Sequence, residues 1–159
     1  MVSYNEANNM HILDILTHPN PFLRHPCASV TEFDDKLQQL VENMFNTMLH
    51  FQGIGLAAPQ VGILQRIIIL EFKNKRMALI NPHIIAAQGE CSKEEGCLSV
   101  PGMNIMIKRA DKIEVEAQNL KGEKIYYKKS GMLARIIQHE TDHLNGILII
   151  DKCENKILC

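Results

Sequence analysis

The chain has 159 residues, of which 46% are hydrophobic and 22% are charged, and its net charge is −1. A chain of this length can bury a core of its own, so we expect a single domain over residues 1–159. A near-neutral chain without a basic patch is not typical of proteins whose main role is to bind nucleic acid, and it offers no polybasic segment to a membrane surface.

The N-terminal segment MVSYNEANNMHILDILTHPNP is polar and lacks the pattern of a signal or transit peptide. No apolar run reaches the roughly 18 residues that a membrane-spanning helix needs. We therefore predict a cytoplasmic protein. The five cysteines are odd in number and irregularly spaced, which in that compartment favours thiols or a metal ligand over a disulfide framework.

The first half of the chain predicts an arm, a helix and two strands. Residues 18–30 contain three prolines and predict an extended arm. Residues 31–50 carry apolar side chains at three- and four-residue steps, which predicts an amphipathic helix capped by Thr31. Residues 66–72 and 76–85 are rich in β-formers and predict two strands joined through Asn74.

The second half predicts a hairpin and a second helix. Residues 112–120 alternate apolar and polar side chains, and the turn at Lys121–Gly122 leads into a second strand, EKIYYKK. The stretch 132–145 contains neither Pro nor Gly, so it predicts a helix, with Ser130 as its cap and Gly146 at its end. Because strands and helices do not alternate regularly, the predicted fold class is α+β.

The second helix carries the motif HETDH. Residues four apart lie on one face of a helix, so His139 and His143 project toward one point, as two ligands of a metal ion do. Glu140 lies one position further round, where it can take a proton from a water held by that ion. The same face continues back through the apolar residues Ile136 and Met132.

A catalytic metal site needs a third protein ligand and an open position for water or substrate. No histidine follows His143, so we expect the third ligand upstream. Cys97, in EEGCLSVPG (94–102), is the best candidate, although Cys91 competes on chemistry alone. A structural zinc site would need a fourth ligand instead, such as Cys91 or Cys153.

A third segment with functional features is GIGLAAPQVG (53–62). Gly53 and Gly55 allow the backbone to approach a ligand closely. Gln60 carries an amide that can donate a hydrogen bond to an oxyanion. No Lys follows the glycines as in a Walker motif, so the segment is not a phosphate-binding loop.

Taken together, the chain resembles the peptide deformylase family. GIGLAAPQ (53–60), EGCLS (95–99) and HETDH (139–143) match the family's three motifs in order, within a resemblance that covers residues 11–151. The resemblance implies an α+β fold with small antiparallel β-sheets packed around a central helix that carries the HExxH motif. It also implies one divalent metal ion per chain, Fe²⁺ with Zn²⁺, Ni²⁺ or Co²⁺ as substitutes, bound by Cys97, His139 and His143. By its place in the motif, Cys97 is favoured over Cys91.

The activity implied by the resemblance is hydrolytic removal of the N-formyl group from the first methionine of new polypeptides. Metal-bound water is the implied nucleophile and Glu140 the general base, while the Gln60 side chain and the Leu98 backbone N–H stabilise the oxyanion. The expected partners are N-formylmethionyl peptides and nascent chains, with a transient ribosome contact. Many bacterial members continue with a C-terminal helix, whereas this sequence stops at Cys159, which argues against a ribosome contact made through such a helix.

The resemblance also suggests residues that contact the substrate. Ile54, Met132 and Ile136 are expected near the methionine side chain, and the Gly55 and Gly96 backbones can pair with an extended peptide as an added strand. For Glu95 and Arg109 we weigh a supporting ion pair against direct substrate contact. For Arg135, on the metal helix, we expect a side chain that reaches the rim of the pocket.

Two alternatives differ from this interpretation in class. The first is another mononuclear metallohydrolase, a peptidase or amidase, with the same activation of water. The second is a non-catalytic protein, either a structural zinc module or a metal-binding relative that only binds peptides. Glu140 and Gln60 argue against the second alternative, because neither residue is needed merely to hold a metal.

Overall fold

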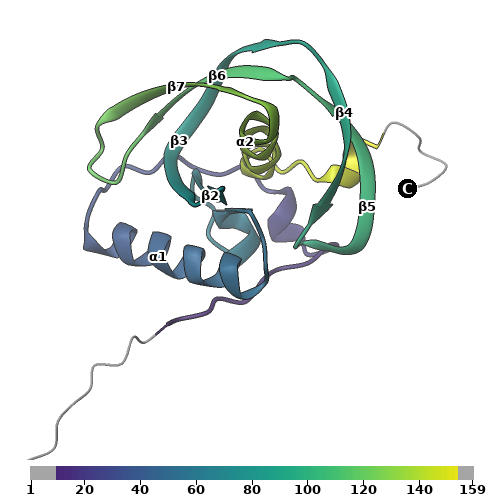
Figure 1. The fold of residues 1–159 in the computed structure, drawn as a ribbon. Helices are drawn as coiled ribbons and strands as arrows, with labels where there is room; N and C mark the ends of the chain where they lie inside the picture. The colour runs from purple at the N-terminus through teal and green to yellow at the C-terminus, as the bar shows by residue number, and fades with distance from the viewer. Residues whose placement is uncertain (1–9, 154–159) are drawn as a thin grey trace, which may run out of the picture.

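The structure, a computed structural model, describes residues 10–153. Residues 1–9 and 154–159, which include Cys159 and both ends of the predicted domain, lie outside the described residues. The described chain contains two helices and two antiparallel sheets, with α2 (Gly131–Leu144) between the sheets (Figure 1). This arrangement confirms the predicted α+β class, with small antiparallel sheets around a helix that carries the HETDH motif.

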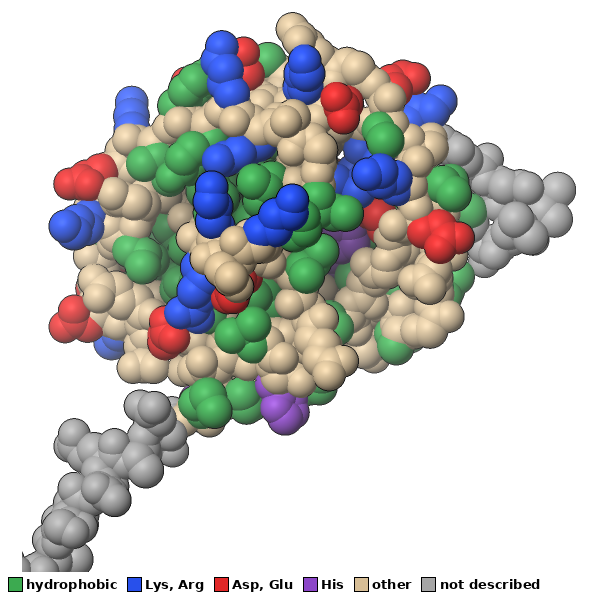
Figure 2. All heavy atoms as spheres, viewed as in Figure 1, with side chains coloured by type: hydrophobic (Ala, Val, Ile, Leu, Met, Phe, Trp, Pro, Cys, Tyr) green, Lys and Arg blue, Asp and Glu red, His purple; other side chains and the backbone are tan. Residues whose placement is uncertain are grey.

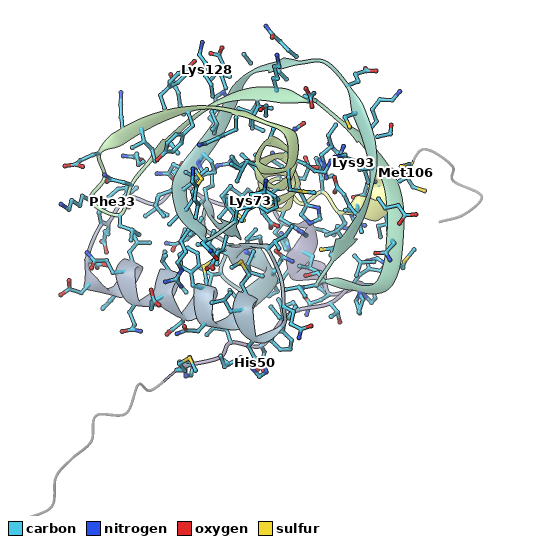
Figure 3. All side chains as sticks on the ribbon, viewed as in Figure 1. Phe33, His50, Lys73, Lys93, Met106 and Lys128 are labelled. Carbon is cyan, nitrogen blue, oxygen red and sulfur yellow. The ribbon has the colours of Figure 1, made fainter. Side chains whose placement is uncertain are left out.

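The larger sheet has five strands in the order β1-β2-β3-β6-β7. Their bounds are β1 Gly55–Ala57, β2 Ile67–Phe72, β3 Lys75–Gln88, β6 Lys112–Gln118 and β7 Lys124–Ser130. The predicted strands and the predicted hairpin are therefore confirmed, with shifted ends. Lys73 and Asn74 both have positive φ, 50° and 61°, as expected for the two-residue turn of a β-hairpin. At the β6–β7 turn, Gly122 lies against the Phe33 ring (Figure 3).

The smaller sheet is a hairpin of β4 (Cys91–Cys97) and β5 (Val100–Arg109), which the sequence patterns above do not predict. Its inward side chains alternate along β5, where Ile105, Ile107 and Arg109 are buried. A strand with one buried face is normally recognised by apolar residues at every second position. In β5 one of these inward positions holds the charged Arg109, which obscures the pattern. In Figure 3, Met106 lies on the outer side of this hairpin, and both Met106 and Lys93 are exposed.

The first helix, α1, spans Asp35–His50 and packs against the larger sheet (Figure 1). The predicted start and cap are wrong: the cap is Asp34, whose side chain accepts a hydrogen bond from the Leu37 amide at 3.0 Å. The helix therefore begins four residues later than the prediction, because Asp34 is extended and satisfies an amide of the first turn. Most of the predicted apolar stripe forms the buried face, at Leu37, Val41, Met44, Phe45 and Met48, but Leu49 is 48% exposed.

The proline-rich arm is extended only in part. Pro21–Arg24 form a 3-10 helix, η1, whose cap Asn20 accepts a hydrogen bond from the Phe22 amide at 3.0 Å. Further along, the Cys27 amide donates to the Leu144 carbonyl at 2.9 Å, and Ala28 pairs with Gln65. The arm thus joins the end of α2 to the segment that precedes β2.

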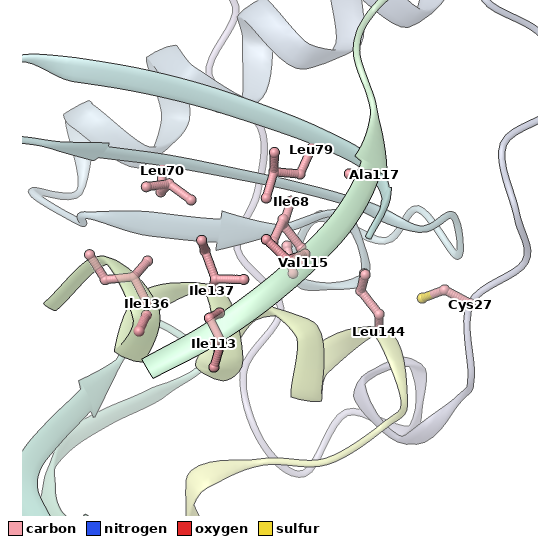
Figure 4. Close-up of a cluster of buried hydrophobic side chains, with 12 residues drawn as sticks. Cys27, Ile68, Leu70, Leu79, Ile113, Val115, Ala117, Ile136, Ile137 and Leu144 are labelled. Atoms are coloured by element: carbon pink, nitrogen blue, oxygen red, sulfur yellow. The ribbon is translucent and has the colours of Figure 1, made fainter. Parts of the chain in front are cut away.

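One face of α2 packs on the larger sheet through the main hydrophobic core (Figure 4). Ile136, Ile137 and Leu144 of the helix meet Ile68 and Leu70 of β2 and side chains from β3 and β6. The helix follows Ser130 and ends before Gly146, as predicted, although the Ser130 side chain makes no capping hydrogen bond. This packing fixes the rotation of α2, and so the direction in which its histidines point.

The outer surface carries charges of both signs. Figure 2 shows Lys and Arg side chains interspersed with Asp and Glu side chains on one face of the molecule. Among residues 10–153, no helix is long and apolar enough to span a membrane.

Candidate metal centre

Three potential metal ligands converge between α2 and the smaller sheet. Cys97 lies at the end of β4, and His139 and His143 lie one turn apart on α2. One ligand atom of each residue lies within 4.8 Å of the other two, and the Cys97 Sγ is 3.3 Å from His143 Nε2. Within the described part of the chain, no further Cys, His, Asp or Glu belongs to this group. Three ligands are the number that leaves an open coordination position.

The other cysteines are not part of the group. Cys27, Cys91 and Cys97 have free thiols, whereas Cys153 is disulfide-bonded. The expectation of thiols is therefore confirmed for three residues and wrong for Cys153. Cys91 starts β4, at the opposite end of the strand from Cys97. Neither Cys91 nor Cys153 therefore supplies the fourth ligand that a structural zinc site would need.

His139 is oriented by a buried carboxylate. Its Nδ1 lies 2.8 Å from Glu95 Oε2. Burial raises the pKa of Glu95, but hydrogen bonds from His139 and Arg109 outweigh burial and hold the pKa at about 2. Glu95 is therefore an ionised carboxylate that accepts the Nδ1 proton of His139, and Nε2 is the ring atom that remains to bind a metal. His143 is 1% exposed, and burial lowers its pKa well below the usual range, which favours the neutral form that binds metals.

Glu95 and Arg109 form the predicted ion pair. Arg109 Nε lies 2.5 Å from Glu95 Oε1, and Arg109 Nη2 lies 2.9 Å from Glu95 Oε2. Arg109 also donates to Asp142 Oδ2 at 2.8 Å. The Arg109 side chain is buried and does not line the cavity beside the metal ligands, so this geometry favours support over direct substrate contact.

The expectation for Arg135 is wrong, because its guanidinium is not at the rim. The residue is 6% exposed, and Nη1 donates to Glu95 Oε1 at 2.6 Å and to the Ile107 carbonyl at 3.0 Å. Nη2 donates to the Cys91 carbonyl. One carboxylate and two backbone carbonyls inside the protein compensate the charge of the guanidinium, so it can be buried. The position of Arg135 on the helix does not reveal these acceptors, because they come from distant strands.

Glu140 lies beside the ligand group in a buried position. Its Oε1 is 3.9 Å from His139 Nε2, and its Oε2 has no hydrogen-bond partner among the described residues. Burial raises the pKa of Glu140 to about 7, although the neighbouring His139 and Arg109 side chains act in the opposite direction. A buried carboxylate with a free oxygen and a pKa near neutrality is suited to accept and return a proton.

Gln60 lies in η2 (Ala58–Val61), beside Cys97. Its Oε1 accepts a hydrogen bond from the Ala57 amide at 2.9 Å, and its Nε2 donates to Ser99 Oγ at 3.1 Å. These two bonds fix the amide so that Nε2 lies 3.7 Å from Cys97 Sγ. Leu98 follows Cys97 directly and lines the same cavity, so two predicted oxyanion donors lie near the predicted metal.

A cavity of about 1180 Å³ opens onto this group. Its lining includes the predicted site residues Ile54, Gly55, Gln60, Glu95, Gly96, Cys97, Leu98, Met132, Ile136, His139 and Glu140. Ile136 is 4% exposed and also belongs to the core, whereas Ile54 is 49% exposed. The sequence interpretation missed Ile15 before the arm, Phe51 after α1 and Met103 on β5, which also line the cavity. Of these, Phe51 is the one with a signal, because it stands two residues before the GIGLAAPQ motif.

Two histidines, one cysteine, a buried carboxylate and an open cavity are the features of a mononuclear metal-dependent hydrolase. The sequence profile of the polypeptide deformylase family matches residues 12–157. A peptide deformylase of Dictyoglomus turgidum is 47% identical over 141 residues, which are 89% of this chain and 92% of the relative. The chain therefore belongs to the polypeptide deformylase family.

Solved structures agree with this assignment. The crystal structure of a peptide deformylase from Thermotoga maritima superposes with a TM-score of 0.90 at 43% identity, over 91% of this chain and 99% of the other. A structure of an Acinetobacter baumannii peptide deformylase bound to Met-Ala-Ser has a TM-score of 0.86 at 34% identity, over 90% of this chain and 99% of the other. The chain is thus a metal-dependent hydrolase that removes the formyl group from the N-terminus of polypeptides.

Proposed function

We propose that Cys97, His139 and His143 hold the metal ion of this reaction, and that Glu140 is its general base. The observation that carries the proposal is the convergence of one thiol and two imidazoles within 4.8 Å, beside a buried carboxylate oxygen that has no hydrogen-bond partner within residues 10–153. A divalent ion held there lowers the pKa of a water molecule and polarises the formyl oxygen.

The chain's own groups supply the proton transfers and the oxyanion donors. Glu140 accepts a proton from the attacking water as the new C–O bond forms at the formyl carbon. Gln60 Nε2 and the Leu98 backbone N–H donate to the formyl oxygen, where negative charge develops. Glu140 then gives the proton to the amine nitrogen as the C–N bond breaks, which leaves formate and a free N-terminus.

We propose that the cavity takes the methionine side chain and the peptide that follows it. Met132, Ile136 and Ile54 offer apolar surface for the side chain, and the Gly55 and Gly96 backbones can pair with an extended peptide. The complex of the A. baumannii protein with Met-Ala-Ser supports this proposal, because that peptide begins with methionine. Glu95 and Arg109 would support His139 rather than touch the peptide.

The native metal, location and partners are further parts of the proposal. We propose Fe²⁺ as the native ion and Zn²⁺, Ni²⁺ or Co²⁺ as substitutes, because a site with one thiolate and two imidazoles suits several of these ions. We also propose that residues 1–159 form one domain, which acts in the cytoplasm on nascent chains and contacts the ribosome transiently.

The test is formate release from a formyl-Met peptide. The protein is purified anaerobically, loaded with Fe²⁺ or Ni²⁺, and compared with Glu140→Ala, whose metal content is measured alongside. We expect formate from the wild type and about 10²–10⁴-fold less from a variant that still binds one ion. Equal rates for the two proteins would show that Glu140 is not the base. Metal binding without formate release, but with cleavage of internal peptide bonds, would favour the peptidase alternative.

A further inference from the structure

The three proposed ligands belong to two parts of the fold that pack separately. The main core joins α2 to the larger sheet and includes Ala134, Ile136, Ile137 and Leu144 of the helix. The apolar cluster under β4 and β5 consists of side chains from these strands, from η3 (Ile149–Asp151) and of Cys153, and among the described residues it includes none from α2. Hydrophobic packing therefore holds the histidines in place, whereas the apolar contacts of the Cys97 segment run through Leu98 to the core of α1 and the larger sheet and not to α2.

Polar side chains connect α2 to the hairpin: Gln138 of α2 binds the backbone of Ala110 just after β5, and charged groups bind the strands themselves. We use the name charge clamp for Glu95, Arg109, Arg135 and Asp142, two residues from the hairpin and two from α2. Arg109 of β5 reaches Asp142 of α2 at 2.8 Å, and Arg135 of α2 reaches Glu95 of β4 at 2.6 Å. The clamp contains two positive and two negative charges, so its members compensate one another inside the protein.

Arg135 has a special place in the clamp. It stands one turn before His139 on α2, and its guanidinium donates to Glu95 Oε1 and to the backbone carbonyls of Cys91 and Ile107. It therefore binds the backbones of both β4 and β5, whereas Arg109 binds side chains only, Glu95 within the hairpin and Asp142 on α2. Because these carbonyls belong to the strands, the bonds help to set how far the hairpin lies from the helix.

We propose that Arg135 is a positioning residue, which docks the β4–β5 hairpin on α2 and so sets the distance from Cys97 to His139 and His143. The inference rests on the proposed ligand set. Metal–ligand bonds tolerate deviations of only about 0.2 Å, so a hairpin that is free to shift would weaken thiolate coordination first. Both imidazoles lie on the same helix as Arg135 and would keep their mutual spacing.

The geometry argues against a direct substrate role for Arg135. Although the residue lines the cavity, three acceptors within the protein already occupy its Nη1 and Nη2 groups. Its 6% exposure also leaves little of the guanidinium for a ligand. A role through Cys97 predicts a change in metal binding, whereas a role in substrate binding predicts a change in KM alone.

The test uses Co²⁺, because a cobalt–thiolate bond gives a charge-transfer absorption band that imidazole ligands do not give. Wild type, Arg135→Met and Arg135→Lys are loaded anaerobically, and their Co²⁺ affinity is measured by competition with a chelator. Arg66→Met is the matched control: Arg66 binds Asn145 Oδ1 at 3.0 Å and the Pro82 carbonyl at 3.1 Å, so it also ties the end of α2 to a strand, but away from the hairpin. Thermal unfolding is recorded for every protein.

We expect Arg135→Met to bind Co²⁺ about 10–100-fold more weakly and to lose intensity in the thiolate band. Arg135→Lys should keep part of the Co²⁺ affinity and part of the thiolate band intensity. Arg66→Met should lose stability without a change in Co²⁺ affinity or spectrum. A wild type without a thiolate band would contradict the proposed ligand set itself.

If the wild type shows the band, a folded Arg135→Met with unchanged affinity and spectrum would overturn the inference. If Arg135→Met does not fold, Arg135→Gln, which keeps an amide donor, is measured in its place and read in the same way. Equal losses of Co²⁺ affinity and of band intensity in Arg135→Met and Arg66→Met would also overturn the inference, because they would indicate a general loss of stability.

Discussion

Gly55 of β1 lies directly against Glu140 of α2. A Cβ atom placed on Gly55 would be 2.5 Å from Glu140 Oε1 and 2.8 Å from Ile136 Cγ2. Real Cβ atoms are not found this close to other atoms, so the proposed general base occupies space that exists only because residue 55 has no side chain.

The Gly55→Ala variant should therefore lose activity while it still binds metal. The added methyl group pushes the Glu140 carboxylate away from the reacting water, and a displacement near 1 Å costs about 100-fold in rate. Formate release and metal content are the measurements. Gly53→Ala is the control, because its Cβ would meet the flexible end of the Leu98 side chain instead. Similar activity in the Gly55→Ala variant and the wild type would contradict the proposed role of Glu140.

Removal of the Gln60 amide should lower kcat. Gln60→Ala removes one of the two proposed oxyanion donors, and the loss of one such donor reduces kcat about 10²–10³-fold. KM should change little, because the charge on the formyl oxygen develops in the transition state. Steady-state kinetics on a formyl-Met peptide measure both constants. Ser99→Ala leaves the amide in place but removes its partner, so it should have a smaller effect; an equal effect would assign the role to Ser99.

The cysteines should differ in their reaction with an alkylating reagent. Burial raises the pKa of Cys27 to about 11, so at pH 8 its thiol is rarely a thiolate and should react slowly in the folded protein. Cys97 should react in the metal-free protein and be protected after Ni²⁺ is added. Mass spectrometry of the digested protein assigns each label to a cysteine. Labelling of Cys97 at the same rate with and without bound metal would show that it is not a ligand.

Gly146 should be sensitive to substitution because of its surroundings. It has a φ of 73°, and a Cβ atom there would overlap the carbonyl oxygen of Arg24 in η1. Gly146→Ala is expected to destabilise the protein by roughly 1–3 kcal/mol in chemical unfolding. Gly102 has a similar φ of 78°, but a Cβ atom there would have no atom within 4 Å, so Gly102→Ala should destabilise the protein less than Gly146→Ala. Equal costs would mean that backbone strain alone, without the overlap, accounts for the effect.

Several features of the site follow from neighbours in the chain. The four-residue spacing of His139 and His143 places them on one face of a helix, and Glu140 must lie beside them, whatever else the chain does. The amphipathic stripe of α1 and the β6–β7 hairpin also follow from local periodicity and turn residues. The start of α1 cannot be read from the local sequence in this way, because Thr31 and Asp34 are both residue types that cap helices and only one of them can cap the first turn.

Features that depend on distant parts of the chain could not be read in this way. The partner of Arg135 is Glu95 on a strand 40 positions earlier, so helix periodicity alone places Arg135 at the rim, although the side chain is buried. The same is true of the choice between Cys97 and Cys91: both begin or end β4, and the path of the hairpin brings one of them to the histidines. Local patterns thus define the helix and its chemistry, whereas long-range packing and buried charge pairs determine which residues complete the site.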